Sequence, residues 1–187
     1  MTEIAASSFA DCSNLQNITI PDGVTVIGAS AFSGCSSLQS VTIPNGVTSI
    51  GSYAFYGCSG LHSVAMPSGV TEIGASTFSD CSSLKNVTIP DGVTKIGNNS
   101  FYKCGSLESV TIPNSVARIG NNAFKDCNGL QNVYVKAVTP PTGTAGMFTN
   151  VSSSLKIYVT YSSLDSYKTA NYWKNYADKI VGYDFGE

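Results

Sequence analysis

The sequence predicts a repeat solenoid, an α/β fold rich in strand, in which short units stack on one another and end on a C-terminal cap. The first observation is a column of phenylalanines that recur every 23 residues (32 − 9 = 23) without insertion. The second is that cysteine, leucine and two β-branched columns keep the same interval. The phenylalanine column contains Phe9, Phe32, Phe55, Phe78, Phe101 and Phe124, and the cysteine column contains Cys12, Cys35, Cys58, Cys81, Cys104 and Cys127. A fixed period of this size is typical of stacked repeats, because one unit cannot bury its apolar face alone.

Residues 84–106 form one representative unit and indicate the elements of every repeat. Residues 84–89 have the pattern L-x-x-V-x-I, whose alternation and β-branched residues predict a short strand. Pro90 ends this strand because proline has no N–H to donate, and an Asp-Gly turn pair follows. Residues 93–96 predict a second short strand, with its Val and Ile inward. Residues 98–104 place Phe and Cys three apart, which suits one helical or 3₁₀ turn.

Glycine also recurs, directly after the second short strand of each unit. The positions are Gly28, Gly51, Gly74, Gly97 and Gly120. We interpret them as turn positions that need the permissive φ of glycine. They do not indicate a phosphate site, because no glycine-rich phosphate loop follows a strand.

The 23-residue interval divides the chain into two expected parts, a repeat array over residues 1–135 and a cap over residues 136–187. The array begins with a truncated unit, residues 1–14, and its full units start at Leu15, Leu38, Leu61, Leu84 and Leu107. Because the first unit is truncated, we expect the natural N-terminus to lie further upstream. We also expect the N-terminal end of the stack to be exposed or covered by a neighbouring molecule.

The cap is expected to contain one more strand and short helices. Residues 156–160 alternate as a strand does, and Ser162 or Ser163 can cap a helix that ends at about Thr169. A second helical segment is expected from the i, i+3, i+4, i+7 spacing of Trp173, Tyr176, Ala177 and Ile180. Such a cap would cover the open end of the stack, as the terminal units of solenoids do.

The composition excludes several classes of protein. The formal charge is −2 and charged residues make up 12% of the chain, with no basic run, so no nucleic-acid partner is expected. No apolar stretch approaches the roughly 20 residues of a membrane span. The first residues lack the basic and apolar regions of a signal peptide.

No residue pattern indicates catalysis or a cofactor. His62 is the only histidine, and its neighbours in the repeat column, Gln39 and Lys85, offer no nucleophile for it to activate. We therefore expect a surface side chain there, no catalytic residues and no cofactor.

The six cysteines have two interpretations. An even count in an exported protein is typical of disulfides. Their constant interval instead predicts a column of small, buried thiols that behave as apolar side chains. Neighbouring thiols in such a column can approach disulfide distance, so oxidation of a pair stays open. A zinc site is not expected, because it needs four ligands around one point.

The preferred site candidates are side chains that point outward from the first strand of each unit. Three columns do so: Gln16, Gln39, His62, Lys85, Glu108 and Gln131; Asn17, Ser40, Ser63, Asn86, Ser109 and Asn132; and Thr19, Thr42, Ala65, Thr88, Thr111 and Tyr134. The first column varies freely in charge, which is typical of a binding face and also of any solvated face. Our candidate ligand face consists of Gln39, His62, Lys85, Glu108, Gln131, Asn86 and Tyr134. The polar side of the second strands, which includes Glu72, Lys95 and Arg118, is the second choice.

The unit L-x-x-V-x-I-P-x-G-V-x-x-I-G-x-x-A-F-x-x-C-x-x resembles the BspA-like leucine-rich repeat of bacterial surface proteins, over about residues 1–135. The segments 156–159, 163–168 and 172–180 also resemble the cap of gut-bacterial members. The resemblance implies a right-handed leucine-rich-repeat solenoid, secretion or display on the cell surface, and adhesion or protein binding. It implies no enzyme activity and no cofactor, and it does not name a ligand.

Three functions therefore compete. The first is a module that binds a host or other extracellular protein through the outward strand columns. The second is a glycan-binding module, because aromatic residues gather late in the chain: Tyr134, Tyr158, Tyr161, Tyr167, Tyr172, Trp173, Tyr176 and Tyr183. Packing of these rings within the cap is the simpler interpretation. The third is a structural spacer that holds another domain away from the cell.

Overall fold

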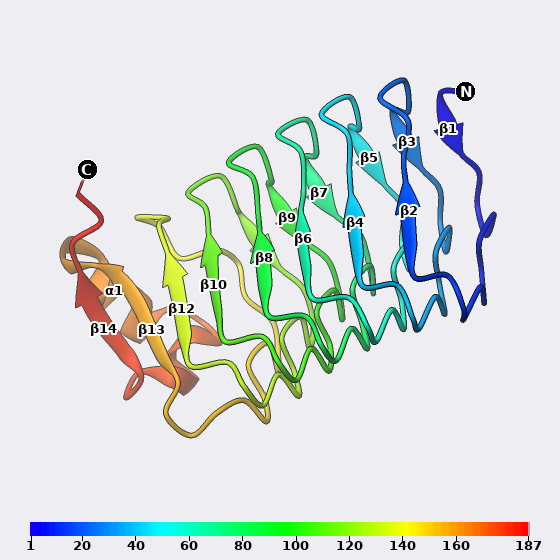
Figure 1. Ribbon diagram of the computed structural model, residues 1–187. Coiled ribbons are helices and arrows are strands. Elements are labelled where there is room, and N and C mark those ends of the chain that lie inside the picture. Colours follow the sequence, from blue (N-terminus) through cyan, green and yellow to red (C-terminus); the bar gives the residue numbers. More distant parts are fainter. Residues whose placement is uncertain (187) are drawn as a thin grey trace.

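The computed structural model describes residues 1–186 and shows a solenoid of parallel strands, with the two termini at opposite ends of the stack (Figure 1). Glu187, the last residue of the expected cap, lies outside the described residues. The repeat solenoid and its C-terminal helical cap, both predicted from the sequence, are confirmed.

The first strand of each unit lies beside its counterparts in the neighbouring units, and together they form the long-strand face. Its strands are β2 (Asn17–Thr19), β4 (Ser40–Thr42), β6 (Ser63–Ala65), β8 (Asn86–Thr88), β10 (Ser109–Ile112), β12 (Asn132–Val135), β13 (Lys156–Thr160) and β14 (Ile180–Tyr183). They pair in parallel as two four-stranded sheets, β2-β4-β6-β8 and β10-β12-β13-β14. The register joins equivalent residues, as Val64 with Val87. Each repeat column of the sequence therefore becomes a row of adjacent side chains.

The second strands form the short-strand face on another side of the solenoid. They are β1 (Glu3–Ile4), β3 (Val26–Ile27), β5 (Ser49–Ile50), β7 (Glu72–Ile73), β9 (Lys95–Ile96) and β11 (Arg118–Ile119). They pair in parallel in the orders β1-β3-β5 and β7-β9-β11. In most of them the first side chain is exposed and the second is buried, which produces an outward polar row above an inward isoleucine row.

The segment between the short strand and the next long strand consists of consecutive β-turns, and our expectation of a helical or 3₁₀ turn there is wrong. In residues 28–35 the Ala31 N–H donates to the Gly28 carbonyl over 3.3 Å, and the Cys35 N–H donates to the Phe32 carbonyl over 3.2 Å. Ser30 and Gly34, third in their turns, have φ values of 56° and 75°, as type II turns require. The intervening N–H groups bond to the next unit instead, as Phe32 does to the Ala54 carbonyl over 2.8 Å. Bonding between units therefore replaces the bonding within a helix.

The recurring glycines have a steric role, which corrects our interpretation of them as positions of permissive φ. None of the five has a positive φ. A Cβ atom on Gly51 would lie 2.5 Å from the Ala29 nitrogen, and one on Gly97 would lie 2.7 Å from the Gly74 carbonyl carbon. These distances are far below van der Waals contact, so the glycines allow neighbouring units to approach backbone to backbone.

Stacked phenylalanine rings run along the centre of the solenoid. Neighbouring rings from Phe9 to Phe124 lie 5.2 to 5.5 Å apart between centroids and are nearly parallel. The stack continues to Phe148, which the 23-residue interval does not reach, with a centroid distance of 5.4 Å. Except for Phe9 at the N-terminal end, these rings are buried. Each ring thus packs against the units on both sides, which couples every unit to its neighbours.

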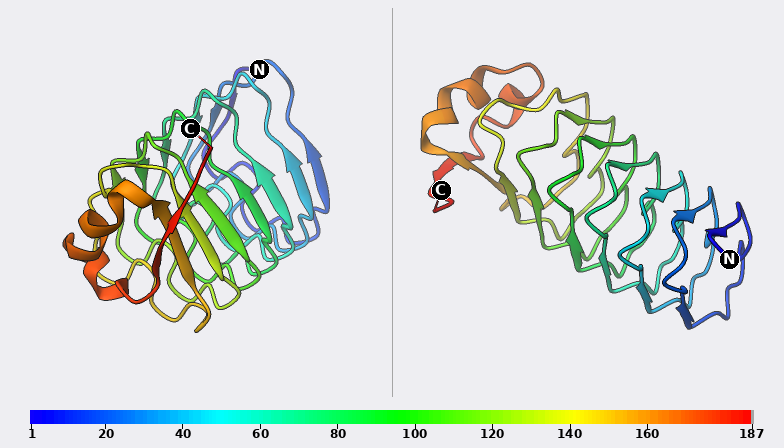
Figure 2. Two further views of the ribbon diagram at one scale, coloured as in Figure 1. Left: turned by 90° about the vertical axis from the view of Figure 1, so that its left-hand side faces the viewer. Right: turned by 90° about the horizontal axis from the view of Figure 1, so that it is seen from above.

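The C-terminal helical segments lie at one end of the stack (Figure 2). They are the 3₁₀ helices η1 (Tyr161–Ser163) and η2 (Trp173–Tyr176) and the helix α1 (Leu164–Thr169). The predicted strand at 156–160 and the helix to Thr169 are confirmed. Ser163 is the N-cap residue, but its hydroxyl pairs with the Thr160 hydroxyl over 2.8 Å and does not cap the helix.

Ile180 belongs to β14, so its predicted place on a second helical face is wrong. It pairs with Ile157 of β13 in a parallel ladder and is buried. Strand pairing satisfies the backbone groups that the edge of β13 would otherwise expose, which explains why the segment leaves the helix after Tyr176. Two buried side chains attach the cap to the preceding connection: the Tyr167 hydroxyl donates to the Ala137 carbonyl over 2.7 Å, and Trp173 Nε1 donates to the Pro141 carbonyl over 2.8 Å.

Candidate binding surface

The structure gathers the predicted candidate residues on the long-strand face. Side chains of the first column are exposed and precede the strands directly; they are Gln39, His62, Lys85, Glu108 and Gln131. Backbone bonds hold this column in register, as from the His62 N–H to the Gln39 carbonyl over 3.2 Å. Asn86 is exposed at the start of β8, whereas Tyr134 is partly exposed on β12.

Tyrosines occupy the C-terminal end of this face. The rings of Tyr134 and Tyr158 stack with centroids 4.7 Å apart and planes 12° apart, because their residues are register partners in β12 and β13. Tyr183, from β14, lies 5.5 Å from each of them at a steep angle. We call these three residues the tyrosine cluster. Burial, with smaller contributions from Tyr158 and Tyr183, raises the pKa of Tyr134, so its hydroxyl stays neutral at physiological pH.

A hollow of about 290 Å³ opens beside the tyrosine cluster. Its lining residues are Thr111, Tyr134, Lys136, Tyr183, Asp184 and Phe185. Phe185 packs on Tyr183 with a centroid distance of 4.9 Å. The lining of the hollow therefore combines aromatic rings with hydroxyl and charged groups.

The remaining late aromatic residues divide between the core and the surface. Tyr167 and Trp173 are fully buried in the cap, with rings 5.0 Å apart at 83°. Tyr176 is partly buried, and its hydroxyl accepts a bond from the Phe148 N–H over 3.2 Å. Tyr161 and Tyr172 are exposed and do not belong to the tyrosine cluster. Of the late aromatic residues, Tyr167, Trp173 and Tyr176 thus pack within the cap, whereas the three residues of the tyrosine cluster lie on the long-strand face.

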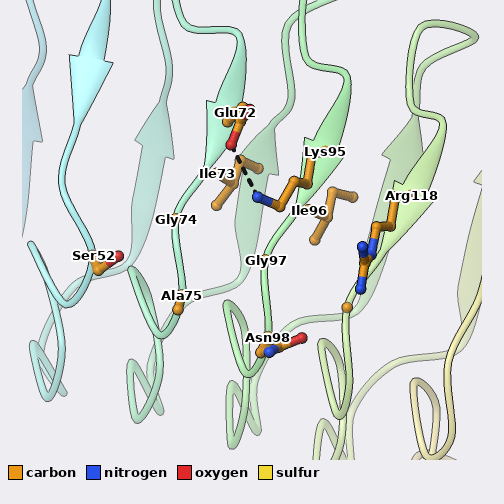
Figure 3. A pocket seen from close by; sticks show the side chains of 11 residues that line it. Ser52, Glu72, Ile73, Gly74, Ala75, Lys95, Ile96, Gly97, Asn98 and Arg118 are labelled. Carbon is orange, nitrogen blue, oxygen red and sulfur yellow. Dashed lines mark hydrogen bonds and ion pairs between the residues drawn. The ribbon is translucent and has the colours of Figure 1, made fainter.

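The short-strand face carries the second candidate surface. Figure 3 shows the side chains of Glu72, Lys95 and Arg118 projecting from successive strands. Lys95 Nζ lies 3.2 Å from Glu72 Oε2 in an exposed ion pair, so these two charges largely cancel. The hollow beneath them has a volume of about 370 Å³, and the recurring glycines leave much of its wall as bare backbone. Arg118 leaves the lining of this hollow with one net positive charge.

The cysteine column is a row of reduced thiols inside the solenoid. All six cysteines are free, and five are buried, whereas Cys12 at the N-terminal end is exposed. Each buried thiol donates to a phenylalanine carbonyl of the preceding unit, as Cys58 Sγ does to Phe32 over 3.2 Å. Burial raises the pKa of Cys35 to about 11 and that of Cys58 to about 12. Within residues 1–186, no group of three or more His, Cys, Asp or Glu side chains is placed to hold a metal ion.

Family membership follows from the repeats themselves. Residues 2–131 match the model of the BspA-type leucine-rich repeat region in six copies. The chain belongs to the BspA-type leucine-rich repeat family. The long-strand face, the phenylalanine stack and the cysteine row are therefore the form that this BspA-type repeat takes here.

Solved structures of bacterial leucine-rich repeat proteins are similar to this BspA-type chain. The leucine-rich repeat protein of T. pallidum is 27% identical, with a TM-score of 0.71 over 98% of this chain and 78% of that one. A leucine-rich cell surface protein of Faecalibacterium prausnitzii is 35% identical, with a TM-score of 0.55 over 72% of this chain and 43% of that one. A leucine-rich repeat protein of Bacteroides ovatus is 28% identical, with a TM-score of 0.52 over 78% and 48%. The BspA-type chain thus spans less than half the length of the last two.

Among curated proteins, none matches the chain. None of the helices within residues 1–186 is long and apolar enough to cross a membrane.

Sequence reasoning did not find Asp184 and Phe185 as part of a candidate surface. They follow β14, which the repeat interval of the BspA-type array does not predict. The alternation of aromatic residues at Tyr183 and Phe185 was the available signal, because alternate residues of an extended segment face the same side.

Proposed function

We propose that this chain is a non-catalytic binding module of a bacterial surface or secreted protein, and that it binds an extracellular protein through the long-strand face. The observation that supports this most directly is the contrast between the two sides of each long strand. The inward side is a filled apolar interior. The outward side is an exposed row that changes in charge and chemistry from unit to unit while the backbone stays in register.

This contrast matches what recognition of a protein requires. A rigid scaffold fixes the positions, and variable side chains determine which partner fits. His62, Lys85 and Glu108 lie in successive units of one column, so an extended surface on a partner can contact several units at once. The similar F. prausnitzii protein is described as a cell surface protein, which supports an extracellular setting.

Surface plasmon resonance of the immobilised chain against a panel of purified host extracellular proteins tests the proposal. For each binder, the double variant Lys85→Glu with Glu108→Lys exchanges two charges on the long-strand face and keeps the net charge. We expect affinity to fall by about tenfold, because like charges now meet across the interface.

The matched control makes the same exchange on the other face, Glu72→Lys with Lys95→Glu. It keeps the ion pair and the net charge, so affinity for the partner should not change. Loss of binding in the control alone would move the interface to the short-strand face. A panel without any binder would contradict the proposal and favour the spacer function.

A further inference from the structure

One face of the Tyr134 ring is covered, and the other is open toward the N-terminal side of the stack. Tyr158 stacks on the covered face at 4.7 Å. Thr111 is the register partner of Tyr134 on the other side. Threonine has no ring to continue the stack, so space remains beside Tyr134 where the next ring of a tyrosine row would lie.

Tyr183 does not close this open face. Its centroid lies 5.5 Å from both Tyr134 and Tyr158. A ring equally distant from two stacked rings lies alongside the pair, because a ring on the outer face of Tyr134 would be much farther from Tyr158. Tyr183 therefore supports the edges of both rings and leaves the outer face of Tyr134 as a wall of the hollow.

Polar groups also line the hollow. Thr111 offers a hydroxyl, Lys136 an ammonium group and Asp184 a carboxylate. One Asp184 oxygen accepts a bond from the Gly186 N–H over 2.9 Å, and a carboxylate has further lone pairs to accept hydroxyl donors. The hollow thus combines a flat aromatic wall with hydrogen-bonding groups in its lining.

We propose that this hollow is a carbohydrate subsite, in which one pyranose ring stacks on the open face of Tyr134 and donates hydroxyl hydrogen bonds to Asp184. A pyranose ring is amphipathic: its faces present C–H groups, and its rim carries hydroxyls. The C–H groups suit the electron-rich face of an aromatic ring, and the hydroxyls suit the polar lining residues. An aliphatic or aromatic side chain of a protein would satisfy only the aromatic wall and would desolvate the carboxylate.

The subsite goes beyond the protein-binding function proposed above, since it needs only the C-terminal end of the long-strand face. Lys85 and Glu108 do not line the hollow. Variants at those two positions and at Tyr134 therefore separate the two functions.

Binding of the complete chain to a printed array of neutral oligosaccharides, followed by saturation-transfer NMR with each soluble oligosaccharide that binds, tests the subsite. We expect saturation at the C–H protons of one sugar ring. The variant Tyr134→Thr installs the residue found at this column position in most units, so the repeat fold is preserved. It should weaken binding by about tenfold, because it removes the stacking surface. The variant Asp184→Asn should weaken binding without abolishing it.

Tyr56→Ser is the matched control, because Tyr56 is an exposed tyrosine on the turn segment and the equivalent residues of the neighbouring units, Ser33 and Ser79, are serines. It should bind sugars as the original chain does. The proposal is overturned if no oligosaccharide binds, or if binding survives Tyr134→Thr. Loss of a protein partner in Tyr134→Thr, with no sugar bound by the original chain, would assign the hollow to protein recognition instead.

Discussion

Phe124 and Phe148 stack with centroids 5.4 Å apart and planes 15° apart, although the chain between them is one residue longer than in the preceding repeats. The Phe124 N–H donates to the Met147 carbonyl over 2.9 Å, as equivalent groups do throughout the array. Ile112 keeps its expected partner Val135, whereas Arg118 pairs one residue late, with Thr142. The extra residue therefore lies within residues 136–141, between two paired positions, and it does not interrupt the phenylalanine stack.

Replacement of a central ring should cost much more than replacement of the terminal ring. Phe78→Ala removes a fully buried ring that stacks on both sides, and we expect it to lower the free energy of unfolding by about 3–5 kcal/mol. Phe9→Ala is the control, because Phe9 is only partly buried and stacks on one side. Urea denaturation followed by circular dichroism measures both. Equal losses would show that the stack does not couple the units.

The repeat period could be predicted from the sequence because each column has one packing role in every unit. The conformation of the turn segment could not be predicted, because the hydrogen bonds that determine it join different units. Ser30 has a positive φ although serine does not favour one, since its N–H donates to the Ser52 carbonyl of the next unit. Local sequence propensity cannot predict a hydrogen bond to a partner that lies a whole unit away.

The glycine row depends on close backbone approach, so it is sensitive to a single methyl group. Gly97→Ala places a Cβ 2.7 Å from the Gly74 carbonyl carbon and 2.8 Å from its oxygen, and should lower stability by roughly 1–3 kcal/mol. Gly105→Ala is the matched control: nothing lies within 4 Å of its Cβ position, so it should be neutral or stabilising by about 0.4–1 kcal/mol. Thermal unfolding of both variants distinguishes them. An unchanged melting temperature for Gly97→Ala would refute the steric role.

The candidate face could be predicted only in part. Alternation along the long strands placed Asn86 and Tyr134 outward, and both have accessible side chains. The contact between Tyr183 and Tyr134 could not be predicted from the repeats. Tyr183 lies on β14, which follows the helical segments of the cap in the sequence and pairs with β13. Which of these residues bind a ligand stays a prediction.

In the folded chain, the thiol of Cys12 should react much faster than the other five thiols. Cys12 is exposed, whereas the other five are buried, and burial raises the pKa of Cys35 and Cys58 among them. Since the thiolate is the reactive form, iodoacetamide near pH 8 should modify Cys12 rapidly in the folded chain. Intact mass spectrometry counts the adducts, and unfolding in concentrated guanidinium chloride should expose all six thiols. Rapid modification of several thiols in the folded chain would contradict the buried row.

Stability should decrease at alkaline pH because of the same thiols. Burial raises the pKa of Cys58 from its ordinary 9.0 to about 12, so between these values the unfolded chain releases the proton and the folded chain retains it. The folded state then binds more protons, and its stability falls as pH rises, by up to about 1.4 kcal/mol per pH unit for each such thiol. Tyrosines and lysines also titrate in this range, so Cys58→Ala is the necessary comparison. Urea denaturation across this range should give a shallower decline for the variant, and identical slopes would show that ionisation of Cys58 does not contribute.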